Sequence, residues 1–254
     1  MITSEEFSKI QTIDGEDSID PKIDIYYHVF LYKKQTTYIA YEIFNNIIDC
    51  GLYSNIECMK IGINYTSECE DEKNNFINFC KKYEKISIIS CINEENYDKN
   101  DKLYEGTTIN ELRKDVSYML NNDIKKYILY AHTKGAYSET KDTDGVIRAW
   151  RNYLVSIFIK NWKNNIKILE RDTVGVIDDM QKANFSFFRT DRIYLIEKNV
   201  PIDKNRYFLE NYIVNTKSGF KTYYANALSP YEHAKYYKNI FESYIELINS
   251  IAIK

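Results

Sequence analysis

Glycine and proline are scarce in this sequence of 254 residues, which contains only 8 Gly and 3 Pro. Such low numbers exclude a collagen-like chain and a low-complexity chain rich in these two residues. Long hydrophobic runs are also missing, because the longest aliphatic and aromatic stretch, around residues 154–159, is too short to cross a bilayer. The polar, acidic start lacks the apolar segment of a signal peptide. These absences predict a soluble, cytoplasmic-type protein with no transmembrane segment.

A basic excess is missing as well, since the formal net charge is −3 at pH 7. A dedicated duplex-binding protein needs cations to neutralise phosphates, so nucleic acid is not an expected partner. Local basic sites for one or two phosphates remain compatible with this charge. The 5 Cys residues are odd in number and lack zinc-ligand spacing, which favours free, buried thiols. Aromatic residues, by contrast, are abundant, with 24 Tyr and 12 Phe, and they argue against a disordered chain.

Strand and helix patterns alternate along the first 180 residues. This alternation implies right-handed crossovers and predicts an α/β fold with a mainly parallel sheet flanked by helices. Thr108 and Glu111 have the spacing of a capping box at the start of one helix. We expect residues 1–22 to be an acidic lead-in and 23–254 to be a single domain. The expected strands are 23–32, 58–65, 86–92, 127–131, 173–177 and 184–189, and the expected helices are 36–50, 68–84, 108–120, 146–170 and 232–251.

The most informative polar segment follows the apolar strand expected at 127–131. Ligands of open α/β sheets bind outside the carboxyl ends of the strands, and His132, Thr133, Lys134 and Gly135 come directly after this one. Lys134 can hold a phosphate as a point charge, and Gly135 lets the backbone approach a ligand closely. The alternative is a solvated loop with a histidine bonded to a backbone carbonyl.

Two further motifs follow in the same region. Asp142-Thr143-Asp144 matches the Asp-x-Asp pattern that binds Mg²⁺ or Mn²⁺ on nucleotide sugars, but chance and a helix-capping role for Asp144 are the simpler explanation. Trp150 and Arg151 begin a long helical pattern, and Arg151 could bind a diphosphate through two hydrogen bonds. The alternative is a core tryptophan beside an arginine whose stem covers apolar surface.

Several common catalytic motifs are absent. The sequence has no GxGxxG dinucleotide fingerprint, no GxxxxGK[ST] phosphate loop and no GxSxG nucleophile motif. These absences argue against nicotinamide-dependent oxidoreductases, P-loop kinases and esterases.

The order of these motifs resembles a family of glycosyltransferase-like proteins found in large DNA viruses, algae and bacteria, related to rhamnan-synthesis-type transferases. The resemblance rests on His132-Thr133-Lys134-Gly135 after an apolar strand, followed by Trp150-Arg151, and it covers about residues 23–215. It implies a GT-A-like, Rossmann-like fold with a nucleotide-sugar half at about 23–145 and an acceptor half at about 146–254. Further matching positions are His28, Gly51, Tyr104, Glu105, Thr107, Thr108, Val174, Gly175, Asn184, Phe185, Phe187, Phe188, Arg189 and Glu210.

The resemblance implies transfer of a sugar from a nucleotide-sugar donor to a hydroxyl acceptor on a glycan, as in polysaccharide biosynthesis, in the host cytoplasm if the chain is viral. Lys134, His132 and Arg151 would stabilise charge on the departing diphosphate, the dominant task in such transfers. Glu210 would be the base that deprotonates the acceptor. A divalent Mn²⁺ or Mg²⁺ at Asp142 and Asp144 stays open, because Lys and Arg can replace it.

The resemblance also implies binding roles for other positions. His28 would contact the nucleotide, Asn184 and Arg189 would hold sugar hydroxyls, and Thr133, Gly135 and Trp150 would line the donor site. The chain departs from the family pattern at Ala149, where an acid is expected, and at Ser186, which interrupts an aromatic strand. These departures support an alternative, a catalytically inactive relative that binds a glycan or a protein.

Overall fold

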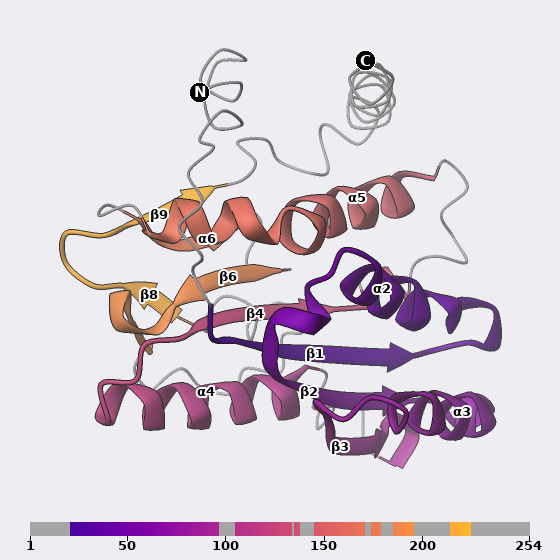
Figure 1. Ribbon diagram of the computed structural model, residues 1–254. Coiled ribbons are helices and arrows are strands. Elements are labelled where there is room, and N and C mark those ends of the chain that lie inside the picture. Colours follow the sequence, from indigo (N-terminus) through magenta and orange to yellow (C-terminus); the bar gives the residue numbers. More distant parts are fainter. Residues whose placement is uncertain are drawn as a thin grey trace, which may run out of the picture.

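The computed structural model describes residues 21–96, 105–133, 135–137, 145–170, 174–178, 185–195 and 214–224 (Figure 1). The expected lead-in and the expected C-terminal helix at 232–251 lie outside the described residues, apart from residues 21 and 22. Among the described residues, no helix is both long and apolar enough to span a bilayer.

A mixed, mostly parallel sheet forms the centre of the fold, which confirms the α/β prediction. Seven strands are arranged in the order β3-β2-β1-β4-β6-β5-β9, and only β6 runs opposite to its neighbours. A separate antiparallel pair joins β7 to β8. The strands are β1 (Ile23–Leu31), β2 (Ile56–Tyr65), β3 (Ile86–Asn93), β4 (Tyr127–His132), β5 (Val174–Asp178), β6 (Ser186–Arg189), β7 (Ile193–Leu195), β8 (Val214–Thr216) and β9 (Lys221–Tyr224).

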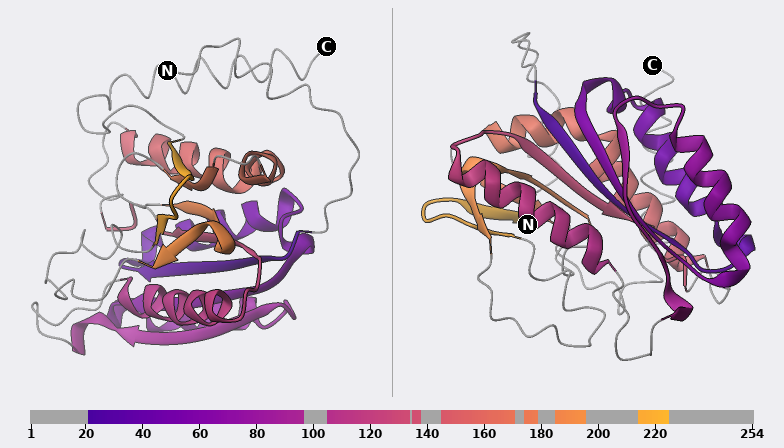
Figure 2. Two further views of the ribbon diagram at one scale, coloured as in Figure 1. Left: turned by 90° about the vertical axis from the view of Figure 1, so that its left-hand side faces the viewer. Right: turned by 90° about the horizontal axis from the view of Figure 1, so that it is seen from below.

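The strand order changes direction between β1 and β4. The chain proceeds from β1 outward to β2 and β3, then returns so that β4 pairs with the other side of β1. Right-handed crossovers in opposite directions put their helices on opposite faces of the sheet. Accordingly α2 (Tyr38–Asp49) and α3 (Glu70–Cys80) cover one face, while α4 (Gly106–Asn121) covers the other (Figure 2, right).

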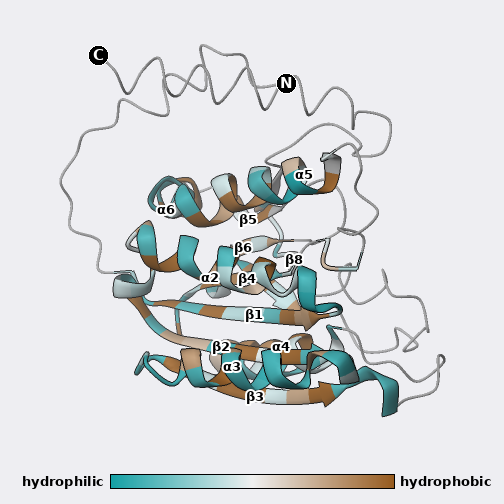
Figure 3. Cartoon of the chain, turned by 90° about the vertical axis from the view of Figure 1, so that its right-hand side faces the viewer, coloured by the Kyte–Doolittle hydropathy of each residue, from teal (hydrophilic) through white to brown (hydrophobic). Residues whose placement is uncertain are grey.

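Alternation along β1 divides its side chains between two cores. Ile25 and Tyr27 pack into the main core beneath α2, whereas Tyr26 packs into a second core with Leu112 and Val116 of α4. Successive strand residues point to opposite faces, so a strand covered on both sides is apolar at nearly every position. In Figure 3, α3 is largely hydrophilic, whereas hydrophobic and hydrophilic residues alternate along β2.

Helix α2 matches its sequence pattern closely. Ile39, Ile43 and Ile47 are spaced by four residues and are fully buried in the main core. The helix ends just before Gly51, which has a φ of +76° and therefore the left-handed conformation that a helix C-terminus favours. The Tyr27 hydroxyl donates to the Ala40 carbonyl over 3.1 Å and ties the helix to β1.

The single long helix expected at 146–170 is interrupted. The chain forms α5 (Val146–Leu154), a π-helical segment (Val155–Lys160) and α6 (Trp162–Glu170). A π-helical segment shifts the backbone hydrogen bonds by one residue and leaves carbonyls for other donors. The Asn165 amide donates to the Ile157 carbonyl over 2.8 Å, and the Trp162 indole donates to the Cys50 carbonyl over 3.3 Å.

Short 3-10 turns complete the described structure. They are η1 (Lys34–Thr36), η2 (Tyr53–Asn55), η3 (Ser67–Cys69), η4 (Glu94–Asn96) and η7 (Thr190–Arg192). All five cysteines are free, as expected, but only Cys69 and Cys80 are buried, and Cys91 is exposed on β3. Burial raises the pKa of Cys80 to about 12, which keeps this thiol protonated.

Candidate functional site

Two histidines meet at the carboxyl edge of the sheet, where the strand order changes direction. His28 on β1 and His132 on β4 are direct partners in the parallel ladder, so their backbones lie about 4.8 Å apart. Both belong to the face covered by α4. Open α/β sheets bind ligands at such a switch point, because the two crossovers diverge there and leave the strand ends uncovered.

The N-terminal turn of α4 holds His28 in place. The His28 Nδ1 lies 3.0 Å from the Thr108 hydroxyl oxygen, and both side chains are buried. Gly62 on β2 makes this possible, because a Cβ at this position would lie 2.0 Å from the same oxygen. A side chain at Gly62 would therefore displace the first turn of α4 from the sheet.

The capping box expected at Thr108 and Glu111 is not formed. Helix α4 begins two residues earlier, with Glu105 at its N-cap position and no side-chain cap bond there. Thr108 bonds His28, and the Glu111 carboxylate pairs with Lys60 at 2.9 Å. Thr108 and Glu111, which the local pattern predicts to cap the helix, thus make tertiary contacts with β1 and β2 instead.

Glu105 lies beside the second histidine. Its Oε1 is 3.9 Å from the His132 Nδ1, within ion-pair distance, and each residue is only 5% exposed. The His132 ring stacks on Tyr130 with centroids 6.2 Å apart and contacts the Phe185 ring edge-on at 5.9 Å. A carboxylate at the start of a helix is also favoured by the helix dipole.

Other buried polar groups occupy the same edge. The Asn64 amide near the end of β2 donates to the carboxylate of Glu94, which is 2% exposed. Ser186 on β6 pairs with Tyr130 in the ladder and is buried, and its hydroxyl has no hydrogen-bond partner within the part of the chain described here. Buried polar atoms without a hydrogen-bond partner are uncommon in folded proteins.

Thr133 and Gly135 follow β4, and their contacts hold the backbone of this turn in place. The Thr133 amide donates to the His28 carbonyl over 3.0 Å, and its hydroxyl accepts from the Phe30 amide over 2.7 Å. Gly135 has a φ of +85°, and a Cβ there would lie 2.2 Å from Ile147 of α5. These contacts fix the chain on either side of Lys134 and bring α5 against the turn.

Arg151 lies on the other face of the sheet from the two histidines. It is fully buried, its Nε donates to the Glu42 carboxylate over 3.2 Å, and an Nη is 3.4 Å from the Tyr38 hydroxyl, both on α2. Trp150 is half-buried against the main core. A Cβ at Gly135 would lie 3.5 Å from the Arg151 Nη1, so the guanidinium packs against the turn that follows His132, on the sheet face opposite the two imidazoles.

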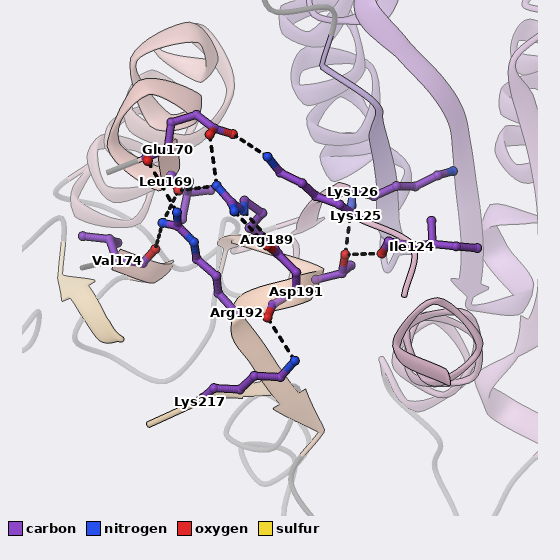
Figure 4. A network of polar contacts seen from close by, with 11 residues as sticks. Ile124, Lys125, Lys126, Leu169, Glu170, Val174, Arg189, Asp191, Arg192 and Lys217 are labelled. Atoms are coloured by element: carbon purple, nitrogen blue, oxygen red, sulfur yellow. Dashed lines mark hydrogen bonds and ion pairs between the residues drawn. The ribbon is translucent and has the colours of Figure 1, made fainter. Parts of the chain in front are cut away.

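Arg189 lies at the opposite end of the sheet. Because β6 is antiparallel, Arg189 pairs with Tyr127 at the start of β4. Its guanidinium makes two 2.7 Å hydrogen bonds to Asp191 and one of 3.0 Å to Glu170 (Figure 4). Burial acts to raise the pKa of Asp191, but the hydrogen bonds from Arg189 outweigh it and lower this pKa below its usual value. The structure thus separates Arg189 from the two histidines.

The surrounding network explains the position of Arg189. Arg192 donates to the carbonyls of Leu169 and Val174 over 2.5 and 2.9 Å, and so joins the end of α6 to β5 (Figure 4). Carbonyls at a helix C-terminus lack intrahelical partners, and cationic side chains satisfy them well. We therefore assign this arginine pair to the stability of the C-terminal part of the sheet.

Five of the expected site residues lie outside the described residues: Lys134, Asp142, Asp144, Asn184 and Glu210. Within the described ranges, no group of three or more His, Cys, Asp or Glu side chains could hold a metal ion.

Sequence reasoning missed Asn64, Glu94 and the pairing of Glu105 with His132. One signal was present, because Lys60, Gly62 and Asn64 alternate with apolar residues along β2 and so share a face. A polar face on a central strand indicates a buried polar site.

Neither protein-family models nor curated proteins match this sequence.

Proposed function

We propose that this protein is a glycosyltransferase that moves a sugar from a nucleotide-sugar donor to a hydroxyl acceptor on a glycan. One observation carries the proposal: His28 and His132 are adjacent and buried on the two strands that flank the switch point. The mixed sheet is compatible with the GT-A-like arrangement that the sequence resemblance implies.

The chemistry of the edge suits a diphosphate. Departure of a nucleoside diphosphate builds negative charge on the bridging oxygen, and pre-placed donors at that position lower the barrier. Imidazole N–H groups supply such donors, and the N-terminus of α4, which begins at Gly106, adds the positive end of a helix dipole at the same edge. Lys134, next in sequence to Thr133, would add a full charge, and Glu210 would deprotonate the acceptor.

A nucleotide-sugar panel tests the proposal. Purified protein is incubated with UDP-, GDP- and TDP-sugars, with and without Mn²⁺, while nucleoside diphosphate release and thermal stability are measured. We expect stabilisation by at least one nucleotide, and its loss in His132→Gln and His28→Gln. Lys114→Gln is the matched control, because this α4 side chain is 77% exposed. Absence of release and of any thermal shift with every nucleotide would contradict the proposal.

A second candidate is a catalytically inactive relative that binds a glycan. The burial of Arg151 against Glu42 favours it, because one of the cations expected at the diphosphate is engaged elsewhere. Binding on a glycan array without nucleotide binding would support this candidate, whereas nucleoside diphosphate release would exclude it.

A further inference from the structure

The contact between His132 and Glu105 joins two buried ionisable groups at the ligand edge. His132 ends β4 and Glu105 precedes α4, so the pair bridges the sheet and the helix that covers it. A carboxylate buried to this degree is costly unless a cation or hydrogen-bond donors face it. An imidazolium 3.9 Å away satisfies this requirement.

We propose that Glu105 is a positioning residue for His132, which orients the imidazole ring and holds it protonated so that it can donate to the diphosphate of the donor. This inference rests on the proposed function for its ligand. The proton stays on the imidazolium during binding, so the step needs no further reactant. His132 thereby supplies at the end of β4 the positive charge that a metal would otherwise provide.

The groups around His132 determine whether its imidazole is protonated or neutral. Glu105 from α4 favours the imidazolium, whereas burial and the neighbouring His28 on β1, when protonated, disfavour it. Tyr130 on β4 and Phe185 contribute ring contacts. The inference requires the carboxylate of Glu105, an opposite charge within about 4–6 Å, to outweigh burial, which acts in the other direction.

Proton titration by NMR measures the pair directly. The chain has only 3 His, so resonances of histidine-labelled protein are assigned with single His→Gln variants. We expect the His132 pKa to lie above the ordinary value of about 6.5. Glu105→Gln should lower it by at least about one unit, whereas Glu111→Gln on the same helix should leave it unchanged.

An equal His132 pKa in the wild type and Glu105→Gln overturns the inference, as does a wild-type value below the ordinary one. If Glu105→Gln fails to fold, Glu105→Asp and the wild-type value decide, since a shorter carboxylate should lower the pKa only partly. A structural role alone would not move the titration.

Ligand binding supplies the second readout. UDP-glucose and GDP-mannose are suitable probes because their diphosphate groups do not titrate between pH 6 and 8. We expect the affinity of the wild type to fall as pH rises through this range, and Glu105→Gln to bind more weakly at pH 7, by up to about tenfold for each unit by which the His132 pKa falls. An equal affinity of both proteins overturns the inference. If neither probe binds, the proposed function loses its support, and the NMR titration still decides the role of Glu105.

Discussion

Substitution of Gly62 by alanine should perturb both the fold and the position of His28 at the carboxyl edge of the sheet. The added Cβ would lie 2.0 Å from the Thr108 hydroxyl oxygen and 3.0 Å from that of Ser90. Relieving this overlap requires the first turn of α4 to move outward, at a cost of about 1–3 kcal/mol for overpacking. Loss of the hydrogen bond between Thr108 and His28 adds about 1 kcal/mol. We therefore expect Gly62→Ala to destabilise the protein by about 2–4 kcal/mol.

Urea unfolding measures this change as a shift of the midpoint at constant slope. Thr108→Ala provides the matched background, because it removes the oxygen that the new Cβ would meet and leaves only contacts of 3.0 Å or more. In that background Gly62→Ala should cost about 1 kcal/mol or less, so the two substitutions should couple strongly. Additive effects, or a loss below about 0.5 kcal/mol for the single Gly62→Ala variant, would refute the reasoning.

Two further predictions concern the arginines that lie away from the histidines. Glu42→Gln removes the carboxylate that faces the buried Arg151 and should lower the free energy of unfolding, measured in urea, by about 2–4 kcal/mol. The double variant with Glu42→Leu and Arg151→Met should recover much of this loss. Equal stability of Glu42→Gln and the wild type would contradict this prediction. Asp191→Asn should cost about 1 kcal/mol at pH 7, since this carboxylate is partly exposed and screened. The pKa of Asp191 is lower in the folded state than in the unfolded state. The stabilisation by this carboxylate is therefore present above the unfolded pKa of about 3.9 and is lost as pH falls through the folded pKa. The unfolding free energies of the wild type and Asp191→Asn should therefore become equal near pH 2. A gap that persists in acid would contradict this assignment.

The sequence was sufficient to locate the main strands, because their signal is local. The apolar run at 127–131 corresponds to β4, and the four-residue spacing of Ile39, Ile43 and Ile47 corresponds to α2. The interruption by the π-helical segment was not visible, since residues 146–170 keep an apolar spacing compatible with one continuous helix.

The assembly of the site depended on information that no local pattern contains. Arg151 reaches the turn after His132, where a Cβ at Gly135 would lie 3.5 Å from its Nη1, but it does so on the face covered by α2, opposite the imidazole of His132. Arg189 ends a strand, as expected, yet β6 runs antiparallel, so the end of this strand lies at the amino edge of the sheet. Strand direction and the side of each crossover are tertiary properties.

Helix α4 is continuous and contacts both the carboxyl edge of the sheet and the second core. Its start carries Glu105 and Thr108 at the carboxyl edge of the sheet, and the following turns carry Leu112 and Val116 in the second core. Contacts that hold the first turn of this helix at the edge of the sheet therefore also oppose separation of the following turns from the second core. Occupancy of the edge would thus also slow the exchange of amide hydrogens several turns further along the helix.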